Sequence, residues 1–416
     1  MIRLPALPRY RYSRRRWHVL CAVVDALGWA ARRILEALRF CRNAPAAHHE
    51  PRSILLVQLD HLGDALLSTG MLAALRARYP AAKIEVLAAS WNREVFDACP
   101  EVDRVYESRV NRFARAGRTG WLKELLHRGW QLRKRRFDLA IDVRGELPLA
   151  LLLWLTGARR RLGWAAGGGG FLLTDSADFL PGRHEVASRQ ALPDLLGIAP
   201  PSGEAAWPPR FDVGAAARQG IDADPAMSEL LREGRPLVVL HVGAGTQAKR
   251  WPVEHWRALL GRLIADRDVG VALIGGEGDA ATAQSILGPH GIPRVVNRVG
   301  SASLIETAAL IERAALFVGC DSGPAHLAAS VGTPVVALFS GTNDARQWRP
   351  WGPRVAVVRN AVPCAPCHRE LCPLADHPCM RGVSPAMALA AVDRMLRELL
   401  ELSSQASLTS TEGLTS

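Results

Sequence analysis

One 25-residue segment, from Leu316 to Ser340, constrains the fold of this chain more than any other. It reads LFVGCDSGPAHLAASVGTPVVALFS: two apolar runs typical of buried parallel strands, separated by a polar elbow and a helix of small residues. In the elbow, Asp321 and Ser322 are residue types that cap helices. Gly323 permits an unusual backbone angle, and Pro324 suits a first helical turn. The segment therefore predicts an α/β unit whose helix start attracts an anion beyond the end of the strand.

The chain after residue 52 repeats this alternation of apolar strand patterns and helix patterns, which is typical of parallel sheets with crossover helices. A proline-rich stretch at 197–209 interrupts it, and a new strand pattern begins at Pro236. We predict an α/β fold with two doubly wound, Rossmann-like halves. The predicted parts are an N-terminal domain at 53–200, a linker at 201–215, a C-terminal domain at 216–402 and a disordered Ser/Thr-rich tail at 403–416.

The first 52 residues form a basic extension. The chain of 416 residues has a net charge of +12, and residues 1–52 carry 11 arginines against three acidic residues. Apolar residues recur there at helical spacing: Trp17, Leu20, Val24, Leu27, Ala31, Ile34 and Leu38. The pattern indicates a basic amphipathic helix, whose apolar run is too short to span a bilayer. We expect it to bind an anionic membrane surface. A solvated or core-docked helix and a signal or anchor sequence are the alternatives.

Two further features of composition limit the partners. No RNP, helix-turn-helix or zinc-finger pattern accompanies the arginines, so no nucleic-acid partner is expected.

Four of the eight cysteines lie in one loop at 364–379: Cys364, Cys367, Cys372 and Cys379. With no credible export signal we place them in a reducing compartment, where thiols or metal ligation are commoner than disulfides. A structural zinc site and a reduced or partly oxidised loop both fit this spacing.

Three elbows follow predicted strands in the second half, and a doubly wound sheet gathers such elbows along one edge. In the first elbow, Gly243 and Gly245 let the backbone approach a ligand, Thr246 offers a hydroxyl, and Lys249 supplies a charge suited to phosphate or is a plain surface cation. In the second elbow, Glu277 can accept hydrogen bonds from ribose hydroxyls, or its charge can stabilise the N-terminus of the following helix. His326, in the third, is a core residue or a donor to phosphate.

The first half supplies carboxylates after its first strand. Asp60 and Asp64 flank a glycine turn there, and a carboxylate at that place can take a proton from an acceptor hydroxyl. Spacing does not choose between the two, and helix capping by Asp64 is the structural alternative. A later turn carries Arg144 and Glu146, for which contact with a charged sugar and simple solvation are both open.

Arg346 and Trp348 follow a strand of the second half, with the same two readings as Arg144: contact with a charged sugar, or exposure in a solvated loop. The glycine run at 167–170 lacks the ending of a P-loop. We expect it to be a flexible loop that moves over a binding cleft.

Taken together, the motifs resemble the heptosyltransferases, glycosyltransferase family 9. The resemblance covers nearly everything from Ser53 to about Leu400. It depends on five motifs in the family's order: LGD, GAGTQAKRWP, IGGEGD, DSGPAHLAASVGTPVVALF and CAPCHRELCPLADHPCM. It implies an inverting enzyme of the GT-B type, with two Rossmann-like domains facing a central cleft. The basic extension departs from the short N-terminus that is usual in the family.

The resemblance also implies roles for individual residues. Asp64 matches the proposed general base, Lys249 a lysine on the donor diphosphate, and Glu277 a contact of the donor nucleoside. The residues that match the diphosphate and sugar elbow are Asp321, Ser322, Gly323 and His326, with Thr246 in the same phosphate loop. Asp60, Arg144, Arg346 and Trp348 are candidates for contact with the acceptor or for support of the site.

The implied donor is ADP-heptose, and the implied acceptor is a lipid-linked oligosaccharide of the lipopolysaccharide inner core. No cofactor or metal is required, and the expected place is the cytoplasmic face of the inner membrane, with peripheral attachment. The alternatives are a GT-B transferase with another nucleotide sugar or acceptor and a noncatalytic protein that binds nucleotide sugars or membranes. Retention of Asp64, Lys249 and Glu277 together argues against the noncatalytic alternative.

Overall fold

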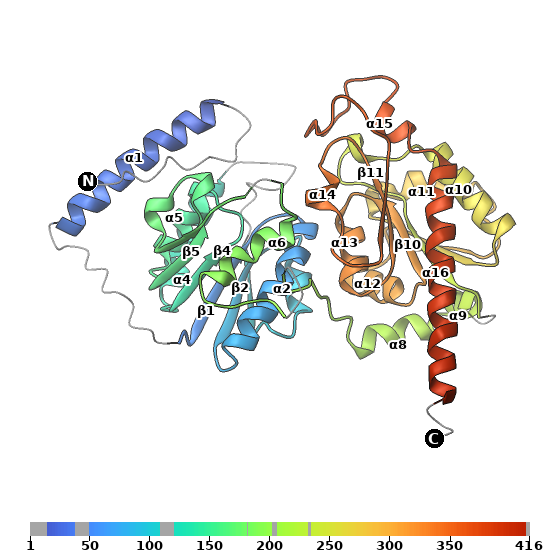
Figure 1. Cartoon of the computed structure of the whole chain (residues 1–416), viewed down its shortest axis with the longest axis horizontal. Helices are drawn as coiled ribbons and strands as arrows, with labels where there is room; N and C mark the ends of the chain where they lie inside the picture. The colour runs from blue at the N-terminus through green and yellow to red at the C-terminus, as the bar shows by residue number, and fades with distance from the viewer. Residues whose placement is uncertain are drawn as a thin grey trace. The chain divides into compact units, whose positions relative to one another are not determined.

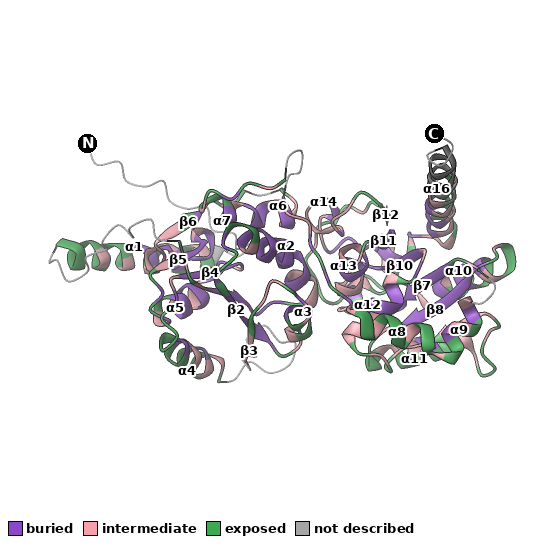
Figure 2. Cartoon of the chain, turned by 90° about the horizontal axis from the view of Figure 1, so that it is seen from below, coloured by how far each residue is buried: buried purple, intermediate pink, exposed green. Residues whose placement is uncertain are grey.

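The computed structural model describes residues 15–37, 50–108, 120–180, 182–201, 206–231 and 234–412. The chain divides into two compact units, residues 1–209 and 210–416, each with its own parallel sheet (Figure 1). This boundary falls inside the predicted linker. Buried strands form the centre of each unit, and the exposed residues lie mainly on outer helices and loops (Figure 2).

The first unit is built on six parallel strands in the order β3-β2-β1-β4-β5-β6. Their bounds are β1 Ser53–Gln58, β2 Lys83–Ala89, β3 Arg104–Ser108, β4 Leu139–Asp142, β5 Arg160–Trp164 and β6 Asp175–Ala177. The central strand β1 pairs with both β2 and β4, and its residues from Ile54 to Gln58 are buried. Strands covered on both faces read as continuous apolar runs, and Ile54 to Val57 of β1 have this pattern.

Helices connect these strands, precede the first of them and follow the last. Their bounds are α1 Arg15–Ala37, α2 Leu62–Arg78, α3 Arg93–Asp97, α4 Trp121–Arg133, α5 Leu147–Leu155, α6 Glu185–Arg189 and α7 Ala191–Asp194, with short 3-10 turns η2 Ala165–Gly167 and η3 Gly170–Leu172. Helix α5 is apolar along most of its length and packs with α4 and the strands in one core cluster.

The N-terminal helix α1 forms as predicted but packs on the first unit through its polar and small residues. Asp25 and Cys21 are buried, and the Asp25 carboxylate accepts from the Gly169 amide at 2.7 Å. Arg32 donates to the carbonyl oxygens of Phe171 at 3.1 Å and of Leu173 at 2.9 Å. The apolar stripe of α1 is therefore left uncovered on the side away from this contact.

The glycine run is wrongly predicted to be a flexible loop. Gly167 to Gly170 are all buried between α1 and the turn after β4. A Cβ on Gly167 would overlap the carbonyl of Gly145, so the glycines are needed for close packing of backbone on backbone.

The second unit has a sheet of the same topology, in the order β12-β11-β10-β7-β8-β9. Its strands are β7 Leu237–His241, β8 Gly270–Ile274, β9 Val295–Asn297, β10 Leu316–Cys320, β11 Val335–Phe339 and β12 Val355–Arg359. The helices are α8 Ala215–Ala223, α9 Pro225–Leu231, α10 Val253–Asp266, α11 Ala280–Leu287, α12 Leu304–Glu312, α13 Gly323–Ser330, α14 Ala345–Trp348, α15 Pro378–Arg381 and α16 Pro385–Glu412, with 3-10 turns η4 Gln247–Lys249 and η5 Glu277–Asp279.

The long helix α16 corrects one prediction. It packs on α10 and on strands β10 to β12, and it continues through Glu412. The tail predicted to be disordered from Ser403 is therefore helical up to that residue. The segment 403–412 contains neither glycine nor proline, and adding a residue to a helix that already exists costs little. Residues 413–416 lie outside the described part of the chain.

Candidate functional site

The candidate anion site of the second unit lies where its strand order reverses. Chain connections run from β7 outward to β8 and β9, whereas β10 lies on the other side of β7. In such sheets the crevice at the carboxyl ends of the two strands beside the reversal is where ligands bind. The predicted elbows at 243–249 and 321–326 follow β7 and β10, so the fold brings both to this place.

The first elbow presents a buried hydroxyl without a protein partner. Thr246 directly precedes η4, and its Oγ1 is buried but makes no hydrogen bond within the described structure. Gly243 allows the turn to pass close to Asp279, since a Cβ there would overlap that carboxylate. A buried polar atom without a partner is costly unless a ligand supplies one. Thr246 is thus ready to donate to a bound anion.

Lys249, at the end of η4, is held by a carboxylate. Its Nζ lies 2.7 Å from Oδ2 of Asp321, and Asn343 donates to the same oxygen at 2.9 Å. Asp321 is only 4% exposed, whereas the Lys249 side chain is 20% exposed. Asp321 therefore orients Lys249, and the Lys249 side chain stays partly exposed to a ligand.

The third elbow begins helix α13. Ser322 is the N-cap residue but does not cap the helix with its side chain; its Oγ contacts the Cys320 carbonyl at 3.0 Å and Nδ1 of His241 at 3.3 Å. The first amides of a helix have no intrahelical partner and attract anions. Gly323 is helical and does not have the positive φ that its place in the elbow suggested.

Two histidines are buried beside this elbow. His241 ends β7, and burial lowers its pKa to about 4, so its imidazole is neutral near neutral pH. His326 is buried on α13, one turn beyond Ser322. His241 links the ends of β7 and β10 through Ser322, which fixes the two elbows relative to each other within this unit.

The other predicted residues of the second unit lie further out. Glu277 is exposed at the start of η5, directly after β8, so its side chain is accessible to a ligand. Arg346 on α14 is exposed and pairs with Asp344 at 2.9 Å, and Trp348 is half-buried at the end of the same helix. The structure therefore groups Thr246, Lys249 and Ser322 at the switch point, and within the described residues no hydrogen bond or ion pair joins Arg346 or Trp348 to them.

The cysteine-rich loop packs against the phosphate loop by hydrogen bonds. The Ala248 amide donates to the Glu370 carbonyl at 2.9 Å, the Cys372 amide donates to Gln247 Oε1 at 3.0 Å, and His377 Nε2 lies 3.1 Å from the Ala248 carbonyl. In the described parts of the chain no three His, Cys, Asp or Glu side chains are grouped to hold a metal ion. The zinc site considered from the cysteine spacing stays a prediction, and the hydrogen bonds of this loop show that it holds η4.

In the first unit the strand order reverses between β1 and β4, and ion pairs occupy that place. Asp60, which is 3% exposed, pairs with Arg144, and Arg144 also contacts Glu146 at 2.7 Å. Asp64 lies in the first turn of α2, and Arg189 of α6 donates to its Oδ1 at 2.8 Å. The Asp64 side chain is 19% exposed and that of Asp60 only 5%, so Asp64 is the more accessible carboxylate.

The capping alternative for Asp64 is not what the structure shows. The N-cap residue of α2 is His61, which makes no side-chain cap, and no described backbone amide donates to the Asp64 carboxylate. Arg189, His241 and Asn343 were missed by sequence reasoning. Arg189 lies 125 residues from Asp64 in the chain, so no local pattern links them.

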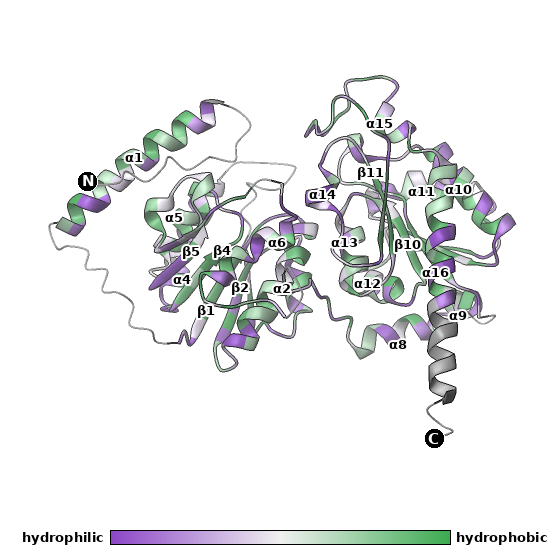
Figure 3. Ribbon diagram, in the orientation of Figure 1, coloured by the Kyte–Doolittle hydropathy of each residue, from purple (hydrophilic) through white to green (hydrophobic). Residues whose placement is uncertain are grey.

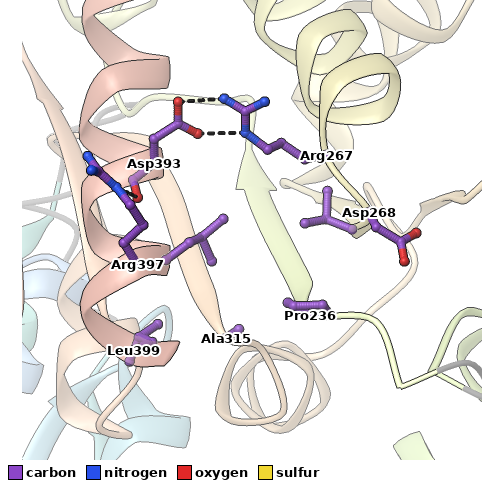
Figure 4. A pocket seen from close by; sticks show the side chains of 9 residues that line it. Pro236, Arg267, Asp268, Ala315, Asp393, Arg397 and Leu399 are labelled. Atoms are coloured by element: carbon purple, nitrogen blue, oxygen red, sulfur yellow. Dashed lines mark hydrogen bonds and ion pairs between the residues drawn. The ribbon is translucent and has the colours of Figure 1, made fainter. Parts of the chain in front are cut away.

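Two cavities lie at the opposite sheet edges. One, of about 540 Å³, lies near the amino ends of β7, β8 and β10, where Arg267 pairs with Asp393 at 2.7 Å (Figure 4). The other, of about 480 Å³, lies near the amino ends of β1, β2 and β4. Neither includes a predicted site residue, and ligands of doubly wound sheets bind at the carboxyl ends instead.

The sequence profile of glycosyltransferase family 9 (heptosyltransferase) matches residues 126–377. Lipopolysaccharide heptosyltransferase 3 of Escherichia coli is 29% identical over 303 residues, which is 70% of this chain and 83% of the relative. Lipopolysaccharide heptosyltransferase 2 of Escherichia coli K12 is 27% identical over 303 residues, 69% of this chain and 82% of the relative.

Solved structures show the same architecture. Escherichia coli ADP-heptose lps heptosyltransferase II aligns with a TM-score of 0.67 and 24% identity, over 83% of this chain and 99% of that one. A glycosyltransferase family 9 protein of Veillonella parvula aligns with a TM-score of 0.69 and 20% identity, over 83% of this chain and 98% of that one. The fold is that of the GT-B heptosyltransferases, as predicted. The chain belongs to glycosyltransferase family 9, the heptosyltransferases.

Proposed function

We propose that this glycosyltransferase moves a heptose from ADP-heptose to an acceptor of the lipopolysaccharide inner core, with inversion at the anomeric carbon. Family membership and the names of its relatives support this donor and acceptor. The observation that carries the proposal is the group at the switch point of the second unit: the unpartnered Thr246 hydroxyl, the tethered Lys249 and the start of α13.

The donor diphosphate would bind at this group. Lys249 and Thr246 contact its oxygens, and the first amides of α13, at Ser322 and Gly323, point their positive dipole ends at them. His326 lies on the same helix, one turn further. Charge that develops on the departing diphosphate is stabilised by these fixed groups, which makes a divalent metal unnecessary for the step. Exposed Glu277 is placed to contact the nucleoside.

Asp64 would act on the acceptor. The acceptor oxygen forms a bond to the anomeric carbon as the bond from that carbon to the diphosphate oxygen breaks. The Asp64 carboxylate takes the hydroxyl proton, and ADP leaves with the electron pair of the broken bond. One displacement of this kind inverts the anomeric centre. The greater exposure of Asp64 favours it over Asp60, whose carboxylate is closed in by Arg144.

A donor panel tests the reaction. Purified protein is mixed with a lipid-linked inner-core acceptor and, in turn, with ADP-heptose and other nucleotide sugars, and released nucleotide is measured with and without a chelator. We expect rapid ADP release with ADP-heptose alone, unaffected by the chelator. Faster turnover of another nucleotide sugar would support a different GT-B transferase, and donor binding without transfer to any acceptor would support the noncatalytic alternative.

We further propose peripheral attachment to the cytoplasmic face of the inner membrane through α1. Of the seventeen exposed large apolar side chains in the described residues, eight lie on this helix: Trp17, Val19, Leu20, Val23, Leu27, Trp29, Ile34 and Leu35. Figure 3 shows apolar residues along the helix. Exposed Arg16 and Arg33 suit an anionic lipid surface. No described helix is both long and apolar enough to cross a membrane.

Vesicle binding tests this attachment. Leu27 and Ile34 are 68% and 59% exposed, so Leu27→Asp/Ile34→Asp removes apolar contact area without disturbing the packed face of α1. We expect binding to vesicles containing phosphatidylglycerol to fall and transfer to a water-soluble acceptor to persist. Leu371→Asp, at a 70% exposed position of the second unit, is the matched control. Unchanged vesicle binding would contradict attachment through α1. So would a change from dimer to monomer in solution, because the apolar side chains of α1 would then contact a second copy of the chain.

A further inference from the structure

Arg189 is a buried arginine that the transfer step, as proposed, does not use. It is the last residue of the short helix α6 and is 5% exposed. An arginine is almost never buried in this way unless its charge is paired, because removing the charge from water is costly. Its partners therefore indicate why it is there.

The guanidinium group of Arg189 holds Asp64 at two points. Nη2 donates to the carboxylate oxygen Oδ1 at 2.8 Å, and Nη1 donates to the backbone carbonyl of the same residue at 2.5 Å. Nη1 also donates to Ser68 Oγ at 3.1 Å. Glu185, the other carboxylate near Arg189, is more distant, at 3.8 Å. Asp64 is thus the principal partner of this cation.

A second layer of hydrogen bonds fixes the same carbonyl. Gln58, the last residue of β1 and fully buried, donates to the Asp64 carbonyl at 3.0 Å and to Ser68 Oγ at 2.8 Å. Ser68 Oγ in turn donates to the Asp64 carbonyl at 2.9 Å. Backbone and Oδ1 are both fixed, whereas no described residue bonds the other carboxylate oxygen, Oδ2.

We propose that Arg189 is the positioning residue of the general base: it fixes Oδ1 of Asp64 so that Oδ2 is directed to the acceptor hydroxyl. This inference rests on the proposed role of Asp64. The planar guanidinium bonds two atoms of one residue at once, which an ammonium group of lysine cannot do with the same geometry. Orientation of this kind matters because displacing a reacting group by about 1 Å can cost about a hundredfold in rate.

The test compares Arg189→Ala and Arg189→Lys with the wild type in steady-state transfer. We expect kcat to fall about 100-fold in Arg189→Ala while the KM for donor changes less than about twofold, because donor binds in the other unit. Guanidinium ion added to Arg189→Ala should restore part of kcat, and ammonium ion should not. Arg189→Lys, which keeps the charge without the fork, should stay well below the wild type.

Controls separate positioning from simple stabilisation. Arg135→Ala removes an arginine that pairs with the buried Glu85 elsewhere in the same unit, and it should leave kcat unchanged. Thermal unfolding shows whether Arg189→Ala is folded; if it is not, Arg189→Lys and its kcat decide the matter. Near-normal kcat in a folded Arg189 variant would overturn the inference. The inference would also be overturned if guanidinium ion raised the kcat of the wild type as much as it raised that of Arg189→Ala.

A double variant distinguishes this inference from the proposed function. If Arg189 acts through Asp64, then Arg189→Ala in the Asp64→Asn background should lower kcat no further. A second loss of similar size would show that Arg189 acts independently and would overturn the inference. If Asp64→Asn alone kept near-normal turnover, the proposed base would be wrong, whereas normal turnover of Arg189→Ala beside an inactive Asp64→Asn would refute only the positioning role.

Discussion

The two units place different chemistry on one topology. Read from one edge to the other, β3-β2-β1-β4-β5-β6 and β9-β8-β7-β10-β11-β12 are the same arrangement, with the reversal beside β1 and beside β7. In the first unit that place holds paired charges, with Asp60 against Arg144 and Asp64 against Arg189. In the second it holds glycines, hydroxyls and one tethered lysine.

This difference shows how much of the site each level of structure decides. Topology decides where polar elbows gather, because the carboxyl ends of adjacent parallel strands meet at one edge. Residue type then decides the ligand: fixed carboxylates suit proton transfer from a hydroxyl, and amides with a lysine suit an anion. Variants of each switch point should therefore affect different kinetic constants.

The largest expected effect is that of Asp64→Asn in the first unit. Asparagine keeps the shape, and its Oδ1 can still accept a hydrogen bond from Arg189, but an amide NH2 that cannot take a proton replaces the Oδ2 oxygen. Transfer should fall about a hundredfold to ten-thousandfold. Donor affinity, measured by calorimetry with ADP, should remain close to that of the wild type. The variant should fold but unfold at a lower temperature, because the buried Arg189 loses the charge of its principal partner. A folded variant with near-normal turnover would show that Asp64 is not the base.

The next effect is that of Lys249→Met in the second unit. Losing a charged contact to phosphate should lower kcat/KM by about 10- to 100-fold and weaken ADP binding in parallel. The variant should also be less stable, because it leaves the Asp321 carboxylate buried without its cation. Lys249→Met/Asp321→Asn should recover stability but not activity. Recovery of both would mean that Lys249 serves only to pair with Asp321.

Much of this arrangement is visible in the sequence, for particular reasons. The two apolar runs predicted within the segment from Leu316 to Ser340 are β10 and β11, because strands buried on both faces read as uninterrupted apolar runs. The elbows after β7 and β10 are predicted because glycines, cap residues and a lysine follow those strands directly. The signal is local in both cases.

What the sequence conceals depends on contacts between distant segments. Arg189 reads as an ordinary helical arginine until the fold brings α6 onto α2. The glycine run reads as flexible because glycine is permissive, and only the packing of α1 and Gly145 against it makes those residues buried. The apolar stripe of α1 could be predicted, but the polar face that packs on the unit could not.

A smaller effect should separate close approach from flexibility in the phosphate loop. Gly243→Ala puts a methyl group where the Asp279 carboxylate lies, so it should destabilise the second unit by about 1–3 kcal/mol and weaken ADP binding. Gly261→Ala is the matched control: it lies inside α10 with open space around it and should stabilise by about 0.5–1 kcal/mol. If urea unfolding gave the same change in the free energy of unfolding for both variants, close packing against Asp279 would not be the reason for a glycine at position 243.

The smallest effect concerns the neutral imidazole that joins the elbows of the second unit. Burial lowers the pKa of His241 to about 4, below the ordinary value of 6.5, so the unfolded chain binds more protons as the pH falls. The stability this histidine contributes is complete above about pH 6.5 and is lost as the pH falls toward 4. Between pH 7 and pH 5.5 the free energy of unfolding should drop by about 1 kcal/mol on its account.

Urea unfolding at the two pH values measures this drop, and His241→Gln should reduce it while keeping an acceptor for the Ser322 hydroxyl. His290→Gln, at an exposed position of the same unit, should leave it unchanged. The first unit has no counterpart of this buried imidazole at its own switch point, where β1 ends in Gln58. If the free energy of unfolding of His241→Gln still decreases between pH 7 and pH 5.5 as much as that of the wild type, other groups cause the acid sensitivity of the second unit. In that case the neutral imidazole of His241 is not the feature that distinguishes this unit from the first.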